Sequence, residues 1–150
     1  MSIMFVIDGD PVAKGRPRFR AIKKFVSTYT PKKTLLAEKH IRDCFKASYP
    51  DFKTPLEGPI SLVVKFYMPV PASISKKKQM SLKLQPHLKR PDLDNLLKTV
   101  CDALNGYVWK DDSQIYLITA IKAYSDDQGP STLVEINNYY EINMKKNCRN

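Results

Sequence analysis

The sequence predicts a small α/β protein, a single domain over residues 1–150 in which helices pack on a mixed β-sheet. Its length suits one domain, and 43% hydrophobic residues are enough for a core. Segments with the two-residue alternation of strands are interspersed with two segments that have the helical 3.6-residue periodicity. The expected order is strand, hairpin, helix, strand, basic segment, helix, strand, strand, followed by a frayed polar tail over residues 143–150.

The N-terminal half supplies the first three strands and the first helix. Residues 3–7 form a compact apolar strand, and residues 8–11 read Asp-Gly-Asp-Pro, a turn. Residues 12–29 alternate basic with aromatic and β-branched residues, which indicates a basic loop leading into a short hairpin. Thr30 and Pro31 are typical of an N-cap and first turn, and the helix should reach about residue 48. Its expected apolar face comprises Leu35, Leu36, Ile41, Cys44 and Phe45.

The C-terminal half begins with an alternating strand over residues 60–68. Residues 72–90 allow two interpretations, a short helix capped by Ser73 or Ser75 or a mobile basic loop. A leucine stripe predicts a helix over residues 93–105, with Asp92 at the capping position and Gly106 as the breaker. Residues 115–124 and 131–136 predict two strands joined by a turn at 126–130.

The charge balance identifies the class of partner. The chain has 25 Lys and Arg against 15 Asp and Glu, a net charge of +10, which favours nucleic acid over an anionic membrane. No apolar run approaches the roughly 18 residues that span a bilayer, and the N-terminus lacks the basic region of a signal peptide. Three widely spaced cysteines argue against a disulfide framework or a zinc site. We therefore expect a soluble protein of the reducing cytoplasm.

Carboxylates cluster at the predicted helix 93–105. Asp92 and Asp94 stand at its start, and Asp94, Lys98 and Asp102 follow an i, i+4, i+8 spacing that places them on one face, opposite the leucine stripe. A second acidic pair, Asp111 and Asp112, comes just before the strand 115–124. Because the chain must turn back after the helix, we expect this pair to lie near it.

These carboxylates predict a site for one or two hard cations. Mg²⁺ prefers oxygen ligands, typically one or two carboxylates together with waters and substrate phosphates. Such ions promote phosphodiester hydrolysis by generating hydroxide and stabilising the leaving oxygen. Lys98 could balance the carboxylates or stabilise charge on the phosphoryl oxygens.

A purely structural interpretation of the same residues is also open. Asp92 could cap its helix, Asp94 and Lys98 could form an exposed ion pair, and Asp111 with Asp112 could make a polar turn. Each of these patterns is common on its own.

Basic residues predict contacts with DNA phosphates, which position the nucleic acid without reading its sequence. The basic side chains around Pro17 alternate, so an extended chain presents them on one face. For Arg16 and Arg18, a phosphate contact is favoured over a solvated surface role because a guanidinium can bind two phosphate oxygens at once. The predicted DNA-binding set is Lys14, Arg16, Arg18, Lys76, Lys77, Lys78 and Arg90. For Lys76, Lys77 and Lys78, a solvated run of charges is an equally open interpretation.

Four other residues attract attention but are expected to be structural. His40 and His87 have no partner at metal-ligand spacing. Cys101 falls within the leucine stripe and should belong to the core. Trp109 is expected to pack under the acidic turn rather than stack on a base.

Three motifs resemble a known family. The strings RPDLDNLLK (residues 90–98), DALNG (102–106) and WKDDSQI (109–115) closely resemble the signature of the RusA family of Holliday-junction resolvases. Residues 9–18 and 30–34 are similar to its phage and Gram-positive branch. The resemblance covers about residues 5–125, although the lysine-rich stretch 73–89 is longer than in compact members.

The resemblance implies a homodimeric, RusA-like α/β endonuclease that binds four-way DNA junctions in recombination and repair. It implies dependence on Mg²⁺, with Mn²⁺ as a substitute, and symmetric nicking of two opposed strands. It assigns the essential metal-binding carboxylates to Asp92, Asp94 and Asp112, and the assisting lysine to Lys98. Asp111 is a less certain ligand and Asp102 a structural residue. The family branch suggests a bacterial protein of phage or prophage origin.

Two other functions remain open at this point. The chain could be a non-catalytic protein that binds junction DNA on the same scaffold. It could also be a nuclease that acts on other branched or flapped DNA. Comparing cleavage of a junction, a flap and a linear duplex separates these possibilities.

Overall fold

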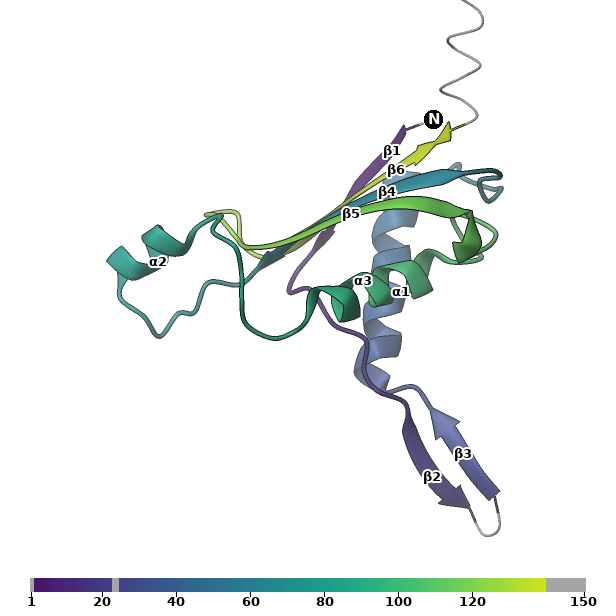
Figure 1. Ribbon diagram of the computed structural model, residues 1–150, viewed down its shortest axis with the longest axis horizontal. Coiled ribbons are helices and arrows are strands. Elements are labelled where there is room, and N and C mark those ends of the chain that lie inside the picture. The colour runs from purple at the N-terminus through teal and green to yellow at the C-terminus, as the bar shows by residue number, and fades with distance from the viewer. Residues whose placement is uncertain (1, 23–24, 140–150) are drawn as a thin grey trace, which may run out of the picture.

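The fold is built on one mixed β-sheet with the strand order β1-β6-β4-β5 (Figure 1). The computed structural model describes residues 2–22 and 25–139. The strands are β1 (Ser2–Asp8), β4 (Ile60–Met68), β5 (Ile115–Tyr124) and β6 (Ser131–Asn138). β4 runs parallel to β5, whereas β6 pairs antiparallel with both β1 and β4. The predicted α/β class and mixed sheet are confirmed.

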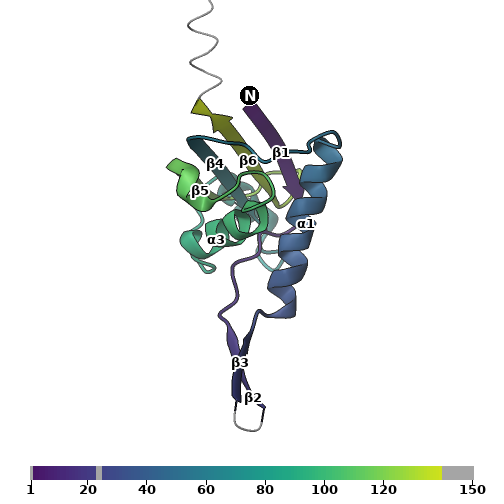
Figure 2. The ribbon, with the colours of Figure 1, turned by 90° about the vertical axis from the view of Figure 1, so that its right-hand side faces the viewer.

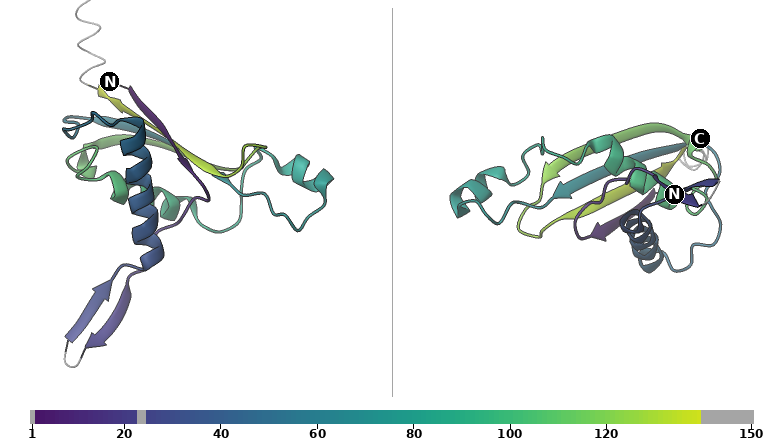
Figure 3. Two further views of the ribbon diagram at one scale, coloured as in Figure 1. Left: turned by 180° about the vertical axis from the view of Figure 1, so that it is seen from behind. Right: turned by 90° about the horizontal axis from the view of Figure 1, so that it is seen from below.

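Two helices, α1 (Lys32–Ser48) and α3 (Leu93–Leu104), cover the same face of this sheet (Figure 3). The alternation in β4 buries every second side chain, from Ile60 to Met68, against them. The core between the layers includes Phe45 of α1 and Leu96 of α3, both fully buried. α3 begins after Asp92 at the N-cap, as predicted. It ends one residue earlier than expected, at Leu104, before the left-handed Gly106 (φ +71°).

The predicted apolar face of α1 is only partly correct. Ile41 and Phe45 are buried, but Leu35 and Leu36 are 51% and 57% exposed. The first turns of α1 extend past the sheet (Figure 2) and contact the loop 12–17 instead of the core. The side chains that this contact buries are polar, Thr34 and Glu38. The N-cap is Pro31 rather than the expected Thr30.

Two elements project from the body in different directions (Figure 1). The predicted hairpin is formed by β2 (Arg18–Ile22) and β3 (Phe25–Tyr29). Residues 72–90 contain the short helix α2 (Lys76–Leu82), whose N-cap Ser75 accepts a hydrogen bond from the Lys78 amide (3.4 Å). α2 buries none of its side chains. The predicted frayed tail lies outside the described residues.

Among the described residues, none of the helices combines the length and the apolar character needed to cross a membrane.

Candidate functional site

An open hollow of about 630 Å³ lies at the N-terminal end of α3. Its lining combines two segments that are far apart in the sequence, the basic loop and the start of α3. The Lys14 amide donates a hydrogen bond to the Asn95 carbonyl (2.9 Å), which fixes the loop against the helix. The lining residues are Lys14, Arg16, Arg90, Pro91, Asp92 and Asn95. The fold thus brings three predicted DNA contacts to one predicted catalytic carboxylate.

The basic surface continues from this hollow toward the hairpin. A second hollow shares Arg16 and Pro91 with the first and is also lined by Arg18 and Lys33. On the hairpin, the strand register places Arg18 and Arg20 on one face. Phe19 and Val26 lie on the other face and are 74% and 71% exposed. The hairpin therefore offers basic groups on one side and apolar groups on the other.

The two carboxylates at the start of α3 are free of the roles that the structural interpretation gave them. Asp92 occupies the N-cap, but its side chain makes no capping hydrogen bond. Asp94 is exposed in the first turn. Asp94 and the exposed Lys98 are not among the salt bridges that the described residues form, in which a nitrogen and a carboxylate oxygen lie within 4.0 Å of each other.

Trp109 holds the second acidic segment. Its side chain is fully buried, and its indole Nε1 donates a hydrogen bond to Oδ1 of Asp112 (2.7 Å). The prediction that Trp109 packs under the acidic turn is confirmed. A rigid buried ring therefore orients the Asp112 carboxylate.

Asp111 has a different task from its neighbour. It caps the short 3₁₀ helix η1 (Asp112–Gln114) by accepting a hydrogen bond from the Ser113 amide (2.8 Å). Hydrogen bonding from the side chain and from the amide of Ser113 lowers the pKa of Asp111. Gln114 completes the capping box and also donates to the carbonyls of Leu56 and Gly58, each at 3.0 Å. These bonds anchor the acidic turn to the loop before β4.

The charge of Asp112 acts on the middle of α3. Burial, together with the negative charges of Asp112 and Asp102, raises the pKa of the Cys101 thiol to about 12, although Lys98 opposes this shift. Cys101 lies i+3 from Lys98 and i+7 from Asp94, which places it at the edge of the leucine stripe, next to these two residues. Cys101 is partly buried and packs against the core, as predicted.

The structure does not bring the three predicted metal ligands together as a closed cluster. Among the described residues, the carboxylates of Asp92, Asp94 and Asp112 do not all lie within 4.8 Å of one another. Asp112 is directed by Trp109, and Asp92 and Asp94 are two positions apart at a helix start. Carboxylates that are separated in this way still suit Mg²⁺, because this ion keeps several water ligands and is also coordinated by substrate phosphates. Their role as ligands stays a prediction.

Lys14 is held by two ion pairs. Its Nζ lies 2.6 Å from Glu38 Oε1 of α1 and 2.6 Å from Asp102 Oδ2 of α3. Burial by itself would lower the pKa of Lys14, but the hydrogen bonds and charges of Asp102 and Glu38 together raise it. Lys14 therefore links the basic loop to both helices, and Asp102 has the structural partner expected of it. The DNA contact of Lys14 stays a prediction.

Lys122 is a positioning residue that the sequence analysis missed. It lies on β5 opposite Phe66, on the face of the sheet that carries the helices. Its Nζ donates hydrogen bonds to the carbonyls of Lys89 (2.6 Å) and Pro91 (2.7 Å), across a cis Arg90–Pro91 peptide bond. A lysine within the apolar strand was the available signal. Lys122 fixes the segment that presents Arg90 and Asp92.

The remaining predicted DNA contacts lie away from the hollow. Lys76, Lys77 and Lys78 are exposed on the projecting helix α2. Their contact with DNA is untested and stays a prediction.

Comparison with known proteins identifies the family. Residues 8–137 match the family model described as Endodeoxyribonuclease RusA. The chain is also 37% identical over 129 residues to the uncharacterized protein YqaN of Bacillus subtilis (strain 168), an alignment that covers 83% of this chain and 89% of that protein. The family match spans the basic loop, both acidic segments and Lys122. The chain therefore belongs to the RusA family of endodeoxyribonucleases.

Proposed function

We propose that this protein is a metal-dependent, structure-selective endonuclease that resolves four-way DNA junctions by symmetric phosphodiester hydrolysis. The hollow at the start of α3 carries this proposal, because Arg16 and Arg90 line it together with Asp92. Guanidinium groups bind phosphate oxygens, so they would hold a DNA strand beside a carboxylate. Membership of the family supports the nuclease activity, and the lining of the hollow supports the place at which the DNA strand would bind.

The proposed mechanism divides the work among few side chains. Asp92, Asp94 and Asp112 would hold Mg²⁺, or Mn²⁺ in its place. When bound, the ion supplies an activated water and neutralises charge on the phosphate. The chain's own contribution is positioning: Arg16 and Arg90 would bind the phosphate backbone beside Asp92, and Lys98 would stabilise negative charge on the phosphoryl oxygens. Trp109 keeps Asp112 oriented, and the Asp111 cap fixes the turn.

A labelled four-way junction, a flap and a matched linear duplex, each with Mg²⁺, Mn²⁺ or EDTA, test this function. We expect paired symmetric nicks on the junction alone, and only with Mg²⁺. Junction binding without cleavage in Mg²⁺ and in Mn²⁺ would indicate the non-catalytic binding protein instead. Faster cleavage of a flap than of the junction would indicate a nuclease for other branched DNA.

Arg16→Ala should weaken binding to junction and duplex alike. Arg16 is exposed and borders both hollows, so the variant loses one phosphate contact without losing core packing. Each phosphate contact contributes about 0.9 to the slope of log K against log salt concentration, so the slope should fall by about one. Fluorescence anisotropy over a salt series measures it. Lys53→Ala, in the loop after α1, is the control. An unchanged slope for Arg16→Ala would show that Arg16 is a solvated surface residue without a phosphate contact.

The dimer is also part of the proposal, because two-fold symmetry presents two sites to two equivalent strands. The structure supports one edge of the sheet as the interface. At the other edge, the hydroxyl of Tyr49 accepts a hydrogen bond from the Met4 amide (2.8 Å) and donates to the Met4 carbonyl (3.0 Å), which obstructs pairing along β1.

Among the described residues, the outer edge of β5 is covered only at its end. Residues 84–87 bond to Lys122 and Tyr124, with the His87 amide 3.0 Å from the Lys122 carbonyl. Over residues 116–121, β5 instead exposes large apolar side chains. A long apolar edge strand is a template for pairing with another chain. The exposed residues are Tyr116, Leu117, Ile118 and Ile121.

Ile118→Lys should therefore convert the dimer into a monomer. Ile118 is 46% exposed, so the lysine costs little within one chain but places two like charges together in the pair. Size-exclusion chromatography with light scattering measures the mass. Val6→Lys on β1, at a site 54% exposed, should remain dimeric. If Ile118→Lys stays dimeric and Val6→Lys becomes monomeric, the interface lies instead on the open face of the sheet near β1.

A further inference from the structure

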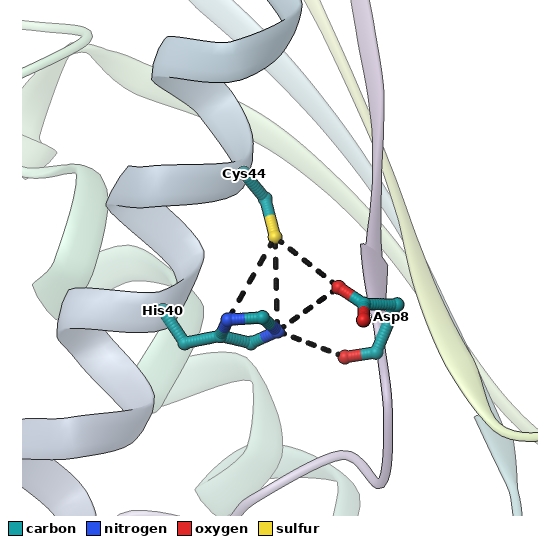
Figure 4. Close-up of side chains that lie close together, drawn as sticks. All are labelled: Asp8, His40 and Cys44. Carbon is teal, nitrogen blue, oxygen red and sulfur yellow. Dashed lines mark hydrogen bonds and ion pairs between the residues drawn. The ribbon is translucent and has the colours of Figure 1, made fainter.

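We propose that Asp8, His40 and Cys44 form a second metal site, selective for Zn²⁺ or a similar transition metal and separate from the carboxylates of α3. These residues come from two elements, the end of β1 and one face of α1 (Figure 4). One ligand atom of each lies within 4.8 Å of the others. From the sequence, His40 was expected to have no partner at metal-ligand spacing, but Cys44 is four residues further on, one helical turn away.

The separations of the ligand atoms fit a tetrahedral ion. His40 Nε2 lies 3.1 Å from Asp8 Oδ1, Cys44 Sγ lies 3.5 Å from Asp8 Oδ1, and Cys44 Sγ lies 3.7 Å from His40 Nε2. Zinc bonds of ordinary length at tetrahedral angles place these pairs about 3.3, 3.5 and 3.6 Å apart. An ion can therefore be held with only small movements of the side chains.

The ligand types select the metal. A thiolate and an imidazole are soft to intermediate donors, which favour Zn²⁺ over Mg²⁺, whereas the all-carboxylate set Asp92, Asp94 and Asp112 has the opposite preference. The side chains of His40 and Asp8 are 49% and 85% exposed, so the ion can enter from solvent and keep a water as fourth ligand. Binding releases the thiol proton of Cys44 and requires the His40 tautomer with its proton on Nδ1, so Nε2 exchanges its hydrogen bond to the Asp8 carbonyl (3.0 Å) for the ion.

The position of the site indicates its consequence. Asp8 is the last residue of β1 and directly precedes the left-handed Gly9 (φ +88°). The following loop carries Lys14 and Arg16 into the hollow. A bound ion would clip the start of this loop to α1. The metal would thus stabilise the support of the proposed DNA-binding surface.

Titration of the purified full chain with Co²⁺, followed by displacement with Zn²⁺, tests the site. We expect one thiolate-to-cobalt charge-transfer band per chain, together with the visible absorption of tetrahedral Co²⁺, and both should disappear when Zn²⁺ is added. Calorimetric titration with Zn²⁺ should show one high-affinity site. Removing a direct ligand should weaken it by more than the 10- to 100-fold typical of losing an outer partner, so we expect at least about 100-fold for Cys44→Ser and for His40→Ala.

Matched variants separate this site from other groups. Cys101→Ser and Cys148→Ser control for the other two cysteines, His87→Asn controls for the other histidine, and Asp94→Asn controls for the carboxylates at the start of α3; all four should retain the thiolate band. Circular dichroism verifies folding of each variant. An unchanged thiolate band in Cys44→Ser, or wild-type protein without any thiolate band, would overturn the proposal. Because the readout is spectroscopic, it does not depend on nuclease activity.

Discussion

Asp94→Asn should abolish junction cleavage while leaving junction binding intact or slightly stronger. Asp94 is exposed in the first turn of α3, so the isosteric amide keeps the helix and removes one negative charge near the bound phosphates. Removing one oxyanion-hole donor from a hydrolase typically costs about 10²- to 10³-fold in rate, and a lost metal ligand should cost at least that. Single-turnover cleavage and gel-shift affinity, measured on the same junction, give the two quantities.

Asp51→Asn is the matched control. Asp51 is equally exposed but lies in the loop after α1, away from the hollow. It should cleave at the wild-type rate. Wild-type cleavage by Asp94→Asn would remove this carboxylate from the mechanism, and equal losses of binding and cleavage would make it a residue for folding or docking.

Lys122→Met should slow cleavage about tenfold to a hundredfold with a much smaller change in affinity. The variant loses both hydrogen bonds that hold the carbonyls of Lys89 and Pro91. These two residues flank Arg90, and Asp92 follows Pro91 directly. A displacement of about 1 Å at a catalytic group can cost about 10²-fold. Hydrogen bonds from a charged donor contribute about 1.5–3 kcal/mol, so the free energy of unfolding should also fall by about that amount.

Three measurements distinguish positioning from general destabilisation. Single-turnover cleavage of pre-bound junction isolates the catalytic step, and Lys122→Arg should restore part of the rate because it returns a charged donor. Lys65→Met, on the neighbouring strand β4 but on the face away from the helices, is the control and should leave the rate unchanged. If Lys122→Met lowers stability but cleaves at the wild-type rate below its melting temperature, the residue acts only in folding.

Local patterns in the sequence were sufficient for most of the secondary structure. The alternation over residues 60–68 and the leucine stripe over 93–105 reflect which side chains each element buries, and burial of one face is a local property. The expectation for α1 was wrong at Leu35 and Leu36 because the helix extends beyond the sheet there. Periodicity does not show where the core ends.

The acidic and basic motifs identified the family, and the structure determined how they meet. From the sequence, Arg16 and Asp92 were two separate predictions, and the hydrogen bond from Lys14 to Asn95 places them in one hollow. Lys14 illustrates the opposite outcome. It resembled its basic neighbours, but two carboxylates, on α1 and on α3, pair with it.

The sequence by itself determined the α/β class, the position of most elements and the residue types available for phosphodiester chemistry. Only the tertiary structure decided that Lys122 fixes the segment before Asp92, and that Asp8 meets His40 and Cys44. The physical reason is the reach of the interactions. Capping, periodicity and strand alternation act within a few residues. These contacts instead join residues more than 30 positions apart, and no spacing pattern in the sequence predicts which residues meet at that separation.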